Sequence, residues 1–269
     1  MTQRWILGTG FAVGLAMAAA VMVATTEVAA QDKSSGTASA ATQRSVLVEL
    51  FTSEGCSDCP PADAALEQLD AKQPIPGVQA IVLSEHVTYW DHQGWSDPYS
   101  LDAMDQHQQQ YVNHFSLPSP ATPEFVVDGA AEVAGNNPPK LDEEITQAGE
   151  RPKLDLQIGD AHVAADGSVN FSVKTAPGHK GTLVAAVAED GAQTKVARGE
   201  NAGRTLRYVA VVRAYKEFGS NALDGRALRW SGGDLDRAEK DGQPMRLVVY
   251  VYNFSNGQVL GVAEKTLSR

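Results

Sequence analysis

Residues 45–69, SVLVELFTSEGCSDCPPADAALEQL, place two cysteines between two different sequence patterns. Residues 45–51 are a short apolar run of strand-forming side chains, and residues 62–69 combine helix formers with leucines three apart. These cysteines, Cys56 and Cys59, are the only two in the chain. A C-x-x-C motif at a strand-to-helix turn is typical of the redox site of thioredoxin-like proteins, because a helix N-terminus stabilises a thiolate.

Two other interpretations of this cysteine pair stay open at this point. A structural disulfide that closes four residues would stabilise the fold by only about 2 kcal/mol in the loop-entropy account. A metal site would need further ligands, because zinc usually takes four and the chain has no second C-x-x-C. We therefore favour dithiol chemistry over an inert bridge or a metal centre.

The segments that follow the cysteines alternate between helix-like and strand-like patterns as far as about residue 149. Their order is β-α-β-α-β-β-α, which predicts an α/β thioredoxin-like domain over residues 44–150. That fold has a cis-proline just before its third core strand, and Pro123 holds this position, so we expect a cis Thr122-Pro123 bond. The expected strands are 45–51, 78–83 and two within 125–133; the expected helices end near residue 72 and span 101–115 and 138–149.

From about residue 154 the pattern changes to short strands separated by glycine-rich turns. Residues 154–158, 161–163, 169–173 and 183–188 are strand-like, and residues 246–263 predict a closing hairpin about Asn256-Gly257. This pattern predicts a β-rich, sandwich-like domain over residues 151–269. We expect this domain to pack beside the redox face and to restrict which partners reach the cysteines.

The first 43 residues carry targeting features rather than a fold. Arg4, the apolar run 5–23 and the small residues 28–30 predict a secretory signal peptide over residues 1–30, with an uncleaved membrane anchor as the alternative. Residues 31–43 predict a flexible leader. We therefore expect a periplasmic or secreted protein without membrane attachment after cleavage, in a compartment where disulfides persist. The net charge of −11 argues against nucleic-acid binding.

A loop rich in aromatic and polar residues, 84–98, follows the second expected strand at the end where the cysteines lie. His86 is a candidate for moving protons during thiol exchange, with Trp90 and Asp91 as candidates for the proton path or the groove. Glu54, two residues before Cys56, is a further candidate proton relay. Packing and local hydrogen bonding are the alternative role for each of these residues.

The same loop supplies the alternative metal hypothesis. His86 or His92 would join Cys56 and Cys59 on copper or zinc. Apart from this alternative, the sequence predicts no cofactor, because it has neither a nucleotide-binding glycine pattern nor a hydrolase motif.

Several runs of this chain together resemble an uncharacterised family of secreted bacterial proteins with a thioredoxin-like domain. The resemblance implies a thioredoxin-like fold and export, and it implies no activity. One departure is Thr88, where the histidine-containing run of the family would have an aspartate. The runs are ELFTSEGCSDCPPAD (49–63), HVTYWD (86–91), GW (94–95), TP (122–123) and GENAGR (199–204).

These observations predict an exported thiol-disulfide oxidoreductase that acts on protein thiols or disulfides of the cell envelope. Cys56 would be the attacking thiol, Cys59 would resolve the mixed disulfide, and Pro123 would shape the substrate groove. The alternatives are a metal-binding or metallochaperone module and a non-catalytic envelope adaptor.

The residues inside and after the motif predict a comparatively reducing cysteine pair. Asp58 places a negative charge beside the thiols, and Pro60 and Pro61 move the regular helix beyond the cysteines, so both features disfavour the Cys56 thiolate. We predict a reduction potential below roughly −180 mV, and a higher potential for Asp58→Asn. Equilibration with glutathione measures both, and a wild-type value near about −120 mV would contradict the prediction.

Overall fold

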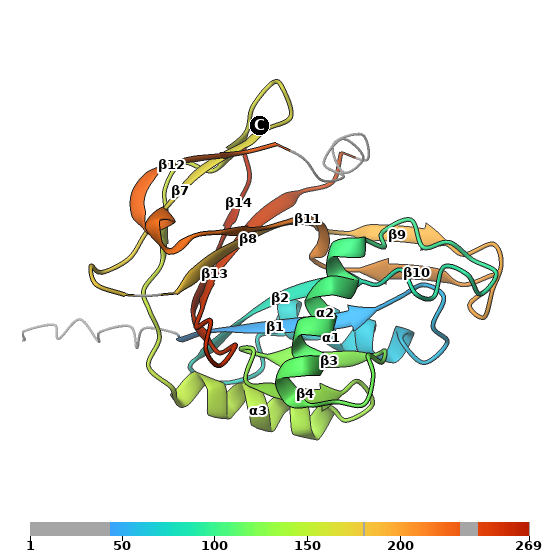
Figure 1. Ribbon diagram of the computed structural model, residues 1–269. Coiled ribbons are helices and arrows are strands. Elements are labelled where there is room, and N and C mark those ends of the chain that lie inside the picture. Colours follow the sequence, from blue (N-terminus) through green and yellow to red (C-terminus); the bar gives the residue numbers. More distant parts are fainter. Residues whose placement is uncertain (1–43, 180, 232–241, 269) are drawn as a thin grey trace, which may run out of the picture. The chain divides into compact units, whose positions relative to one another are not determined.

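The computed structural model describes residues 44–179, 181–231 and 242–268, which belong to one compact unit (Figure 1). The predicted signal peptide, residues 1–30, and leader, residues 31–43, lie outside the described residues. Within the described residues, no helix has both the length and the apolar character needed to cross a membrane.

The first half of the unit has the element order that the sequence predicts, β-α-β-α-β-β-α. It is a mixed α/β region, and each expected helix and strand is present with bounds that differ by only a few residues. The elements are β1 (Arg44–Thr52), α1 (Pro60–Lys72), β2 (Val78–His86), α2 (Asp102–Phe115), β3 (Glu124–Val127), β4 (Ala131–Ala134) and α3 (Pro138–Glu150).

The second half is β-rich, as predicted, and contains one short 3-10 helix, η1 (Ser220–Ala222). The sequence analysis did not identify four of its strands, β9 to β12. The strands are β5 (Gln157–Ile158), β6 (His162–Val163), β7 (Val169–Lys174), β8 (Thr182–Glu189), β9 (Ala192–Lys195), β10 (Thr205–Tyr208), β11 (Val211–Phe218), β12 (Asp224–Trp230), β13 (Met245–Tyr252) and β14 (Val259–Thr266).

A single eight-stranded mixed sheet runs through both halves in the order β14-β13-β8-β11-β2-β1-β3-β4. The strands β11, β2 and β1 are parallel, and every other neighbouring pair in this sheet is antiparallel. The link between the halves is the pair Val211 and Ser84, where β11 lies beside β2. β1 and β2 are therefore central strands of the sheet, with neighbours on both sides.

Helices cover both faces of β1 and β2. Phe51 contacts the rings of His107 and Tyr111, so α2 packs on the face that carries Phe51. Thr52 points to the opposite face, where its hydroxyl donates to Asp63 of α1 at 2.7 Å. Figure 1 shows α2 in front of the sheet and α1 behind it. The cysteine turn is thus on the α1 face.

A smaller sheet, β12-β7-β5 with β6 paired to β7, packs against the part of the large sheet that belongs to the second half. Alternate residues of β8 bury on opposite faces, as expected for a strand between two layers. Val184, Ala186 and Ala188 join the hydrophobic cluster of the first half. Leu183, Ala185 and Val187 join the cluster that includes β7 and β12.

The structural boundary between the halves is less sharp than the predicted division at residues 150 and 151. The change from alternating helices and strands to strands alone does occur there. The large sheet and its hydrophobic cluster, however, continue across it. The second half supplies to that cluster Val184, Ala186, Ala188, Ala210, Val212, Val248, Tyr250, Val259 and Val262.

A chain that ends at Glu150 is therefore expected not to fold cooperatively. Removal of the second half would expose the edge of β2 and the apolar side chains of the shared cluster. A domain of this size is only marginally stable, so we expect this loss of buried surface to unfold it. We expect a broad denaturation transition and weak near-ultraviolet circular dichroism, compared with a sharp transition for the full chain. A sharp transition for the shortened chain would instead show that residues 44–150 fold on their own.

Candidate functional site

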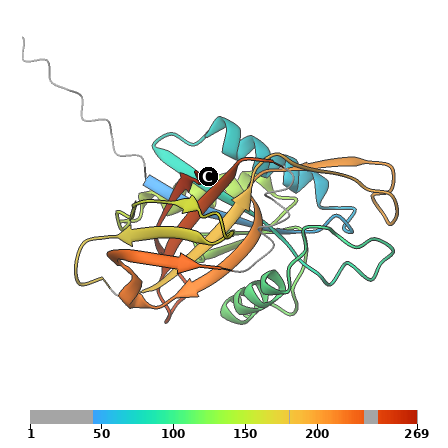
Figure 2. The same cartoon turned by 90° about the horizontal axis from the view of Figure 1, so that it is seen from above.

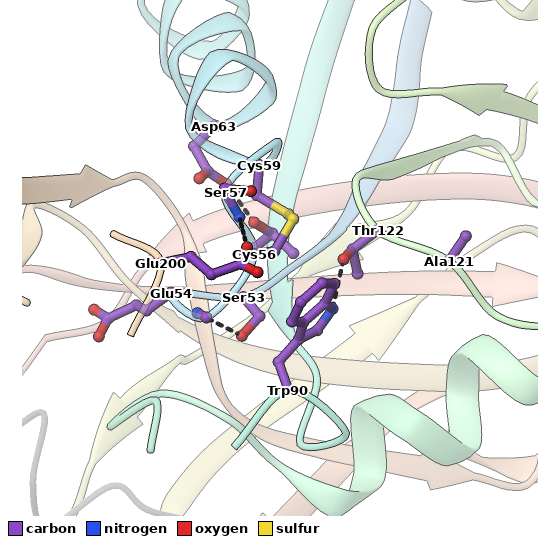
Figure 3. Close-up of a disulfide and its surroundings, with 12 residues drawn as sticks. Ser53, Glu54, Cys56, Ser57, Cys59, Asp63, Trp90, Ala121, Thr122 and Glu200 are labelled. Carbon is purple, nitrogen blue, oxygen red and sulfur yellow. Dashed lines mark hydrogen bonds between the residues drawn. A yellow bond between two sulfur atoms is a disulfide. The ribbon is translucent and has the colours of Figure 1, made fainter. Parts of the chain in front are cut away.

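The two cysteines form a disulfide in the turn between β1 and α1 (Figure 3). The Cys56 N–H donates to the Ser53 carbonyl at 3.2 Å, and Cys59 is the N-cap residue of α1. Pro60 and Pro61 occupy the first positions of the helix, where the absent N–H groups have no intrahelical acceptor to lose. The predicted start of the regular helix at the proline pair is therefore confirmed, with the cysteines ahead of it.

Both cysteines are buried, with Cys56 1% exposed and Cys59 fully covered. Cys56, which we expect to be the attacking thiol, is therefore covered in this disulfide form. The cover comes in part from residues 196–204, the loop between β9 and β10, which we name the cover loop. The β9–β10 hairpin extends past the ends of β1 and β2 (Figures 1 and 2).

Asn201 fixes the cover loop to the cysteine turn. It is fully buried, and its side-chain amide donates to the carbonyls of Glu54 at 2.9 Å and of Cys56 at 2.8 Å. Its own oxygen accepts from Arg204 at 2.9 Å, so the amide has partners on both sides. The exposed Glu200 accepts from the Ser57 N–H at 3.2 Å. A residue 145 positions along the chain thus holds the backbone of the cysteine motif.

Trp90 covers another side of the motif. A Cβ atom added to Gly55 would lie 3.0 Å from the Trp90 Cβ, so the glycine allows the close approach. The indole N–H donates to the Thr122 hydroxyl at 2.8 Å, which ties the aromatic loop to the segment before β3. Figure 3 shows Trp90 and Thr122 on one side of the disulfide and Glu200 on the other.

Four buried ionisable side chains gather around this turn. Asp97 accepts from His86 Nδ1 at 2.7 Å and from the Glu54 backbone N–H at 2.8 Å. Glu54 turns its carboxylate toward the Trp95 indole, which donates at 2.7 Å. Asp63, one turn into α1, accepts from Thr52. We name Glu54, Asp63, His86 and Asp97 the buried ionisable group.

Burial changes how these groups titrate. It raises the pKa of Asp63 to about 7 and, with the charge of Asp97, raises that of Glu54 to about 7. Burial would lower the pKa of His86, but the Asp97 carboxylate outweighs it and the pKa is raised. Burial likewise opposes ionisation of Asp97, yet the His86 ring lowers its pKa. The site therefore holds two carboxyl groups that exchange protons near neutral pH.

The remaining predicted site residues have clear positions. The Thr122-Pro123 bond is cis, as expected. Asp91 shapes its loop by accepting from the Asp97 N–H at 3.0 Å and the Ser100 hydroxyl at 2.9 Å. His92 is exposed.

The alternative metal set of Cys56, Cys59 and His86 is not assembled in this structure. The two sulfurs are bonded to each other, and His86 Nδ1 is paired with Asp97. Among the described residues, the side chains close enough to share an ion form a different set, and it contains none of these three.

Sequence reasoning missed three residues of the site. Asp63 and Asn201 lie inside runs that carry the family resemblance, but the spacing of the residues assigns them no role. Asp97 lies at the end of the aromatic loop, eleven residues after its partner His86. Each of these three is a polar residue that the fold brings to its hydrogen-bond partner, so only the three-dimensional contacts identify its role.

The fold and the site together define a mixed α/β protein with a C-x-x-C disulfide at the start of a helix and ionisable groups buried around it. The chain belongs to the DUF1223 family, described as a protein of unknown function, which it matches over residues 47–251. The resemblance found in the sequence to a family without an assigned activity is thereby confirmed. No curated protein matches the chain.

A solved structure has a similar fold. It is an X-ray crystal structure, from a structural genomics consortium, of a protein of Agrobacterium tumefaciens. The two chains are 21% identical, with a TM-score of 0.58, and the match covers 82% of this chain and 93% of the other. The match therefore extends over both halves of the protein and supports the fold alone.

The titration of Asp63 predicts how stability depends on pH. Its pKa is about 7 in the folded protein against 3.8 for an ordinary aspartate, so the folded state binds the extra proton. Stability from this group is therefore lost as the pH rises between these two values. Replacing Asp63 by Asn should reduce the fall in unfolding free energy between about pH 5 and pH 8 by roughly 2–3 kcal/mol.

Chemical denaturation of the oxidised protein at the two pH values measures this difference. The groups that face Asp63, namely His86, Asp97, Glu54 and Thr52, are all retained in the variant. Asp58→Asn is the matched control, because Asp58 is an exposed acid in the same motif and should leave the pH dependence as it is. An equal fall in Asp63→Asn and wild type would contradict the prediction.

Proposed function

We propose that this protein is a thiol-disulfide oxidoreductase of thioredoxin-like type, with Cys56 and Cys59 as its redox pair. The observation that carries the proposal is a disulfide at a helix start with carboxyl groups of pKa about 7 buried beside it. A disulfide that closes four residues adds little stability, so a chemical role accounts for it better than a structural one. Burying such carboxyl groups costs stability, which is typical of functional sites.

The exchange proceeds in two thiolate attacks. In the reducing direction the Cys56 thiolate attacks a target disulfide, forms a mixed disulfide and releases the first target thiolate. The Cys59 thiolate then attacks Cys56 Sγ, re-forms the Cys56–Cys59 bond and releases the second target thiolate. Two electrons pass to the target, and a dithiol donor must reduce the pair again. The oxidising direction is the reverse sequence with a target dithiol.

The buried ionisable group supplies the proton transfers that this cycle needs. Each cysteine loses a proton when it becomes a thiolate, and a carboxylate with a pKa near 7 can accept it at neutral pH. Asp63 lies one turn of α1 after Cys59, and Figure 3 shows its side chain near that cysteine. Glu54 precedes Cys56 by two residues and is joined to Asp97 through its own backbone N–H. We assign Asp63 as the proton acceptor, because the Glu54 carboxylate points away from the disulfide and toward Trp95 (Figure 3).

The cover loop accounts for the role of the second half. Because Asn201 and Trp90 cover the disulfide, a partner has to displace the cover loop or match its surface before a sulfur can be attacked. The β-rich half therefore selects partners, which fits its placement at the redox turn. We propose that these partners are protein thiols or disulfides outside the cytoplasm, where such a disulfide persists.

Replacing each cysteine in turn tests the assigned roles. Cys59→Ala should accumulate mixed disulfides through Cys56, because nothing resolves them, whereas Cys56→Ala should form none. Non-reducing electrophoresis of cell-envelope extracts, followed by mass spectrometry of the linked peptides, identifies the cysteine that is bonded.

The double variant Cys56→Ala/Cys59→Ala is the control for non-specific association and should yield no linked partner. Partners bonded through Cys59 would reverse the role assignment. Absence of mixed disulfides in Cys59→Ala, together with no reduction of insulin by the wild type, would overturn the oxidoreductase proposal and favour a non-catalytic adaptor.

A further inference from the structure

We propose a second site, in which Glu49 of β1, Glu85 of β2 and His107 of α2 bind one first-row divalent cation. One side-chain atom from each residue lies within 4.8 Å of the other two. Glu85 is paired with Phe51 across the parallel strands, and Glu49 lies two residues before Phe51, so both carboxylates project to the α2 face. The site is therefore on the face opposite the cysteine turn and shares no residue with it.

His107 has the geometry of a metal ligand. Its Nε2 lies 2.8 Å from Glu49 Oε1 and 3.9 Å from Glu85 Oε2, so one ring nitrogen faces both carboxylates. Its other nitrogen, Nδ1, lies 3.3 Å from the Tyr215 hydroxyl. Metal-binding histidines usually hold their second nitrogen in such an outer hydrogen bond, which fixes the ring orientation.

Glu49 is oriented in the same way. The Tyr111 hydroxyl donates to Glu49 Oε2 at 2.7 Å, which leaves Oε1 toward the centre of the cluster. The Tyr215 hydroxyl is in turn 3.1 Å from the Tyr250 hydroxyl, so tyrosine hydroxyls lie around Glu49 and His107. This arrangement is a set of inner ligands with an outer shell of hydrogen bonds.

Glu85 supplies an independent observation that points to an ion. It is fully buried, and neither of its carboxylate oxygens has a hydrogen-bond partner among the described residues. Its neighbour Glu49 is a second carboxylate and repels it. A buried carboxylate without donors is strongly unfavourable, and a divalent cation would supply the missing charge.

A cleft gives the ion a route to the cluster. It has a volume of about 380 Å³, and His107 forms part of its lining. Three protein ligands leave at least one coordination position for water or a small anion, and the cleft lies beside His107 to provide it.

The ligand atoms indicate the class of ion. Two carboxylates and one imidazole suit zinc, manganese or iron in the divalent state, whereas copper(I) prefers the sulfur ligands that this cluster lacks. The proposed site therefore differs in chemistry and position from a metal held by Cys56 and Cys59.

Metal titration tests the site directly. The protein is treated with a chelator and desalted, and zinc or manganese is added. Calorimetry and elemental analysis after gel filtration should give one ion per chain. Glu85→Gln should weaken binding at least 100-fold, because a neutral amide replaces the least compensated carboxylate while keeping its shape. Cys56→Ala/Cys59→Ala should still bind one ion.

Two further variants separate a lost ligand from a damaged fold. Glu124→Gln is the matched control, since Glu124 is a buried strand carboxylate that is paired with Gln108 outside the cluster, and it should bind like the wild type. Tyr215→Phe removes the hydroxyl that partners His107 and Tyr250 but keeps the three ligands, and it should weaken binding about 10-fold to 100-fold. Bound metal should also raise the melting temperature of the wild type more than that of Tyr215→Phe.

Two results would overturn the proposal. One is a folded wild type that takes up neither zinc nor manganese. If Glu85→Gln is then more stable than the wild type, a proton shared by the carboxyl groups occupies the cluster. The other is metal uptake that is lost in Cys56→Ala/Cys59→Ala and kept in Glu85→Gln.

Discussion

The organisation of this protein depends on the burial of ionisable side chains at the ends of two parallel strands. Glu49 and Glu54 come from β1 and the segment after it, and Glu85 and His86 come from the end of β2. All four are fully buried. Buried charges cost several kcal/mol each unless other groups compensate them. The neighbouring elements are therefore required for more than hydrophobic packing, because they carry the partners of Glu49, Glu54 and His86.

Each neighbouring element contributes in a definite way. The aromatic loop after β2 brings Asp97 to His86, and α2 brings His107 and Tyr111 to Glu49. Because successive residues of a strand point to opposite faces, Glu85 and His86 belong to different clusters although they are adjacent. One pair of strands thus serves the cysteine turn on one face and the carboxylate–histidine cluster on the other.

Local sequence patterns were sufficient to predict the helices and strands of the first half, but they did not predict all the strands of the second half. Residues 45–51 and 78–83 are continuous apolar runs, so their burial as central strands could be predicted. The strand β11 contains charged residues, and its Arg213 is fully buried beside the Tyr99 ring, which no hydrophobic pattern reveals. The hairpin β9–β10 is largely polar and is placed by the aromatic loop. Its role depends on contacts across the sheet rather than on its own composition.

The functional site shows the same division. The C-x-x-C spacing and the position of Pro123 identify the cysteine turn, because both signals come from residues that are close in the sequence. Other roles can be assigned only from the structure, because strand register and helix packing bring the partners together. This holds for Asn201, Asp63 and the Glu85–His107 cluster.

The bond from Asn201 to the Cys56 carbonyl couples two equilibria. Cys56 belongs to the four-residue ring that opens on reduction, so the ring and the cover loop share a hydrogen bond. By thermodynamic reciprocity, any difference in how tightly the loop holds the oxidised and reduced turns is an equal contribution to the redox equilibrium. A tenfold difference corresponds to about 30 mV in a two-electron couple. In the proposed exchange, a partner that lifts the loop would therefore change the driving force of electron transfer at the moment it gains access to the sulfurs.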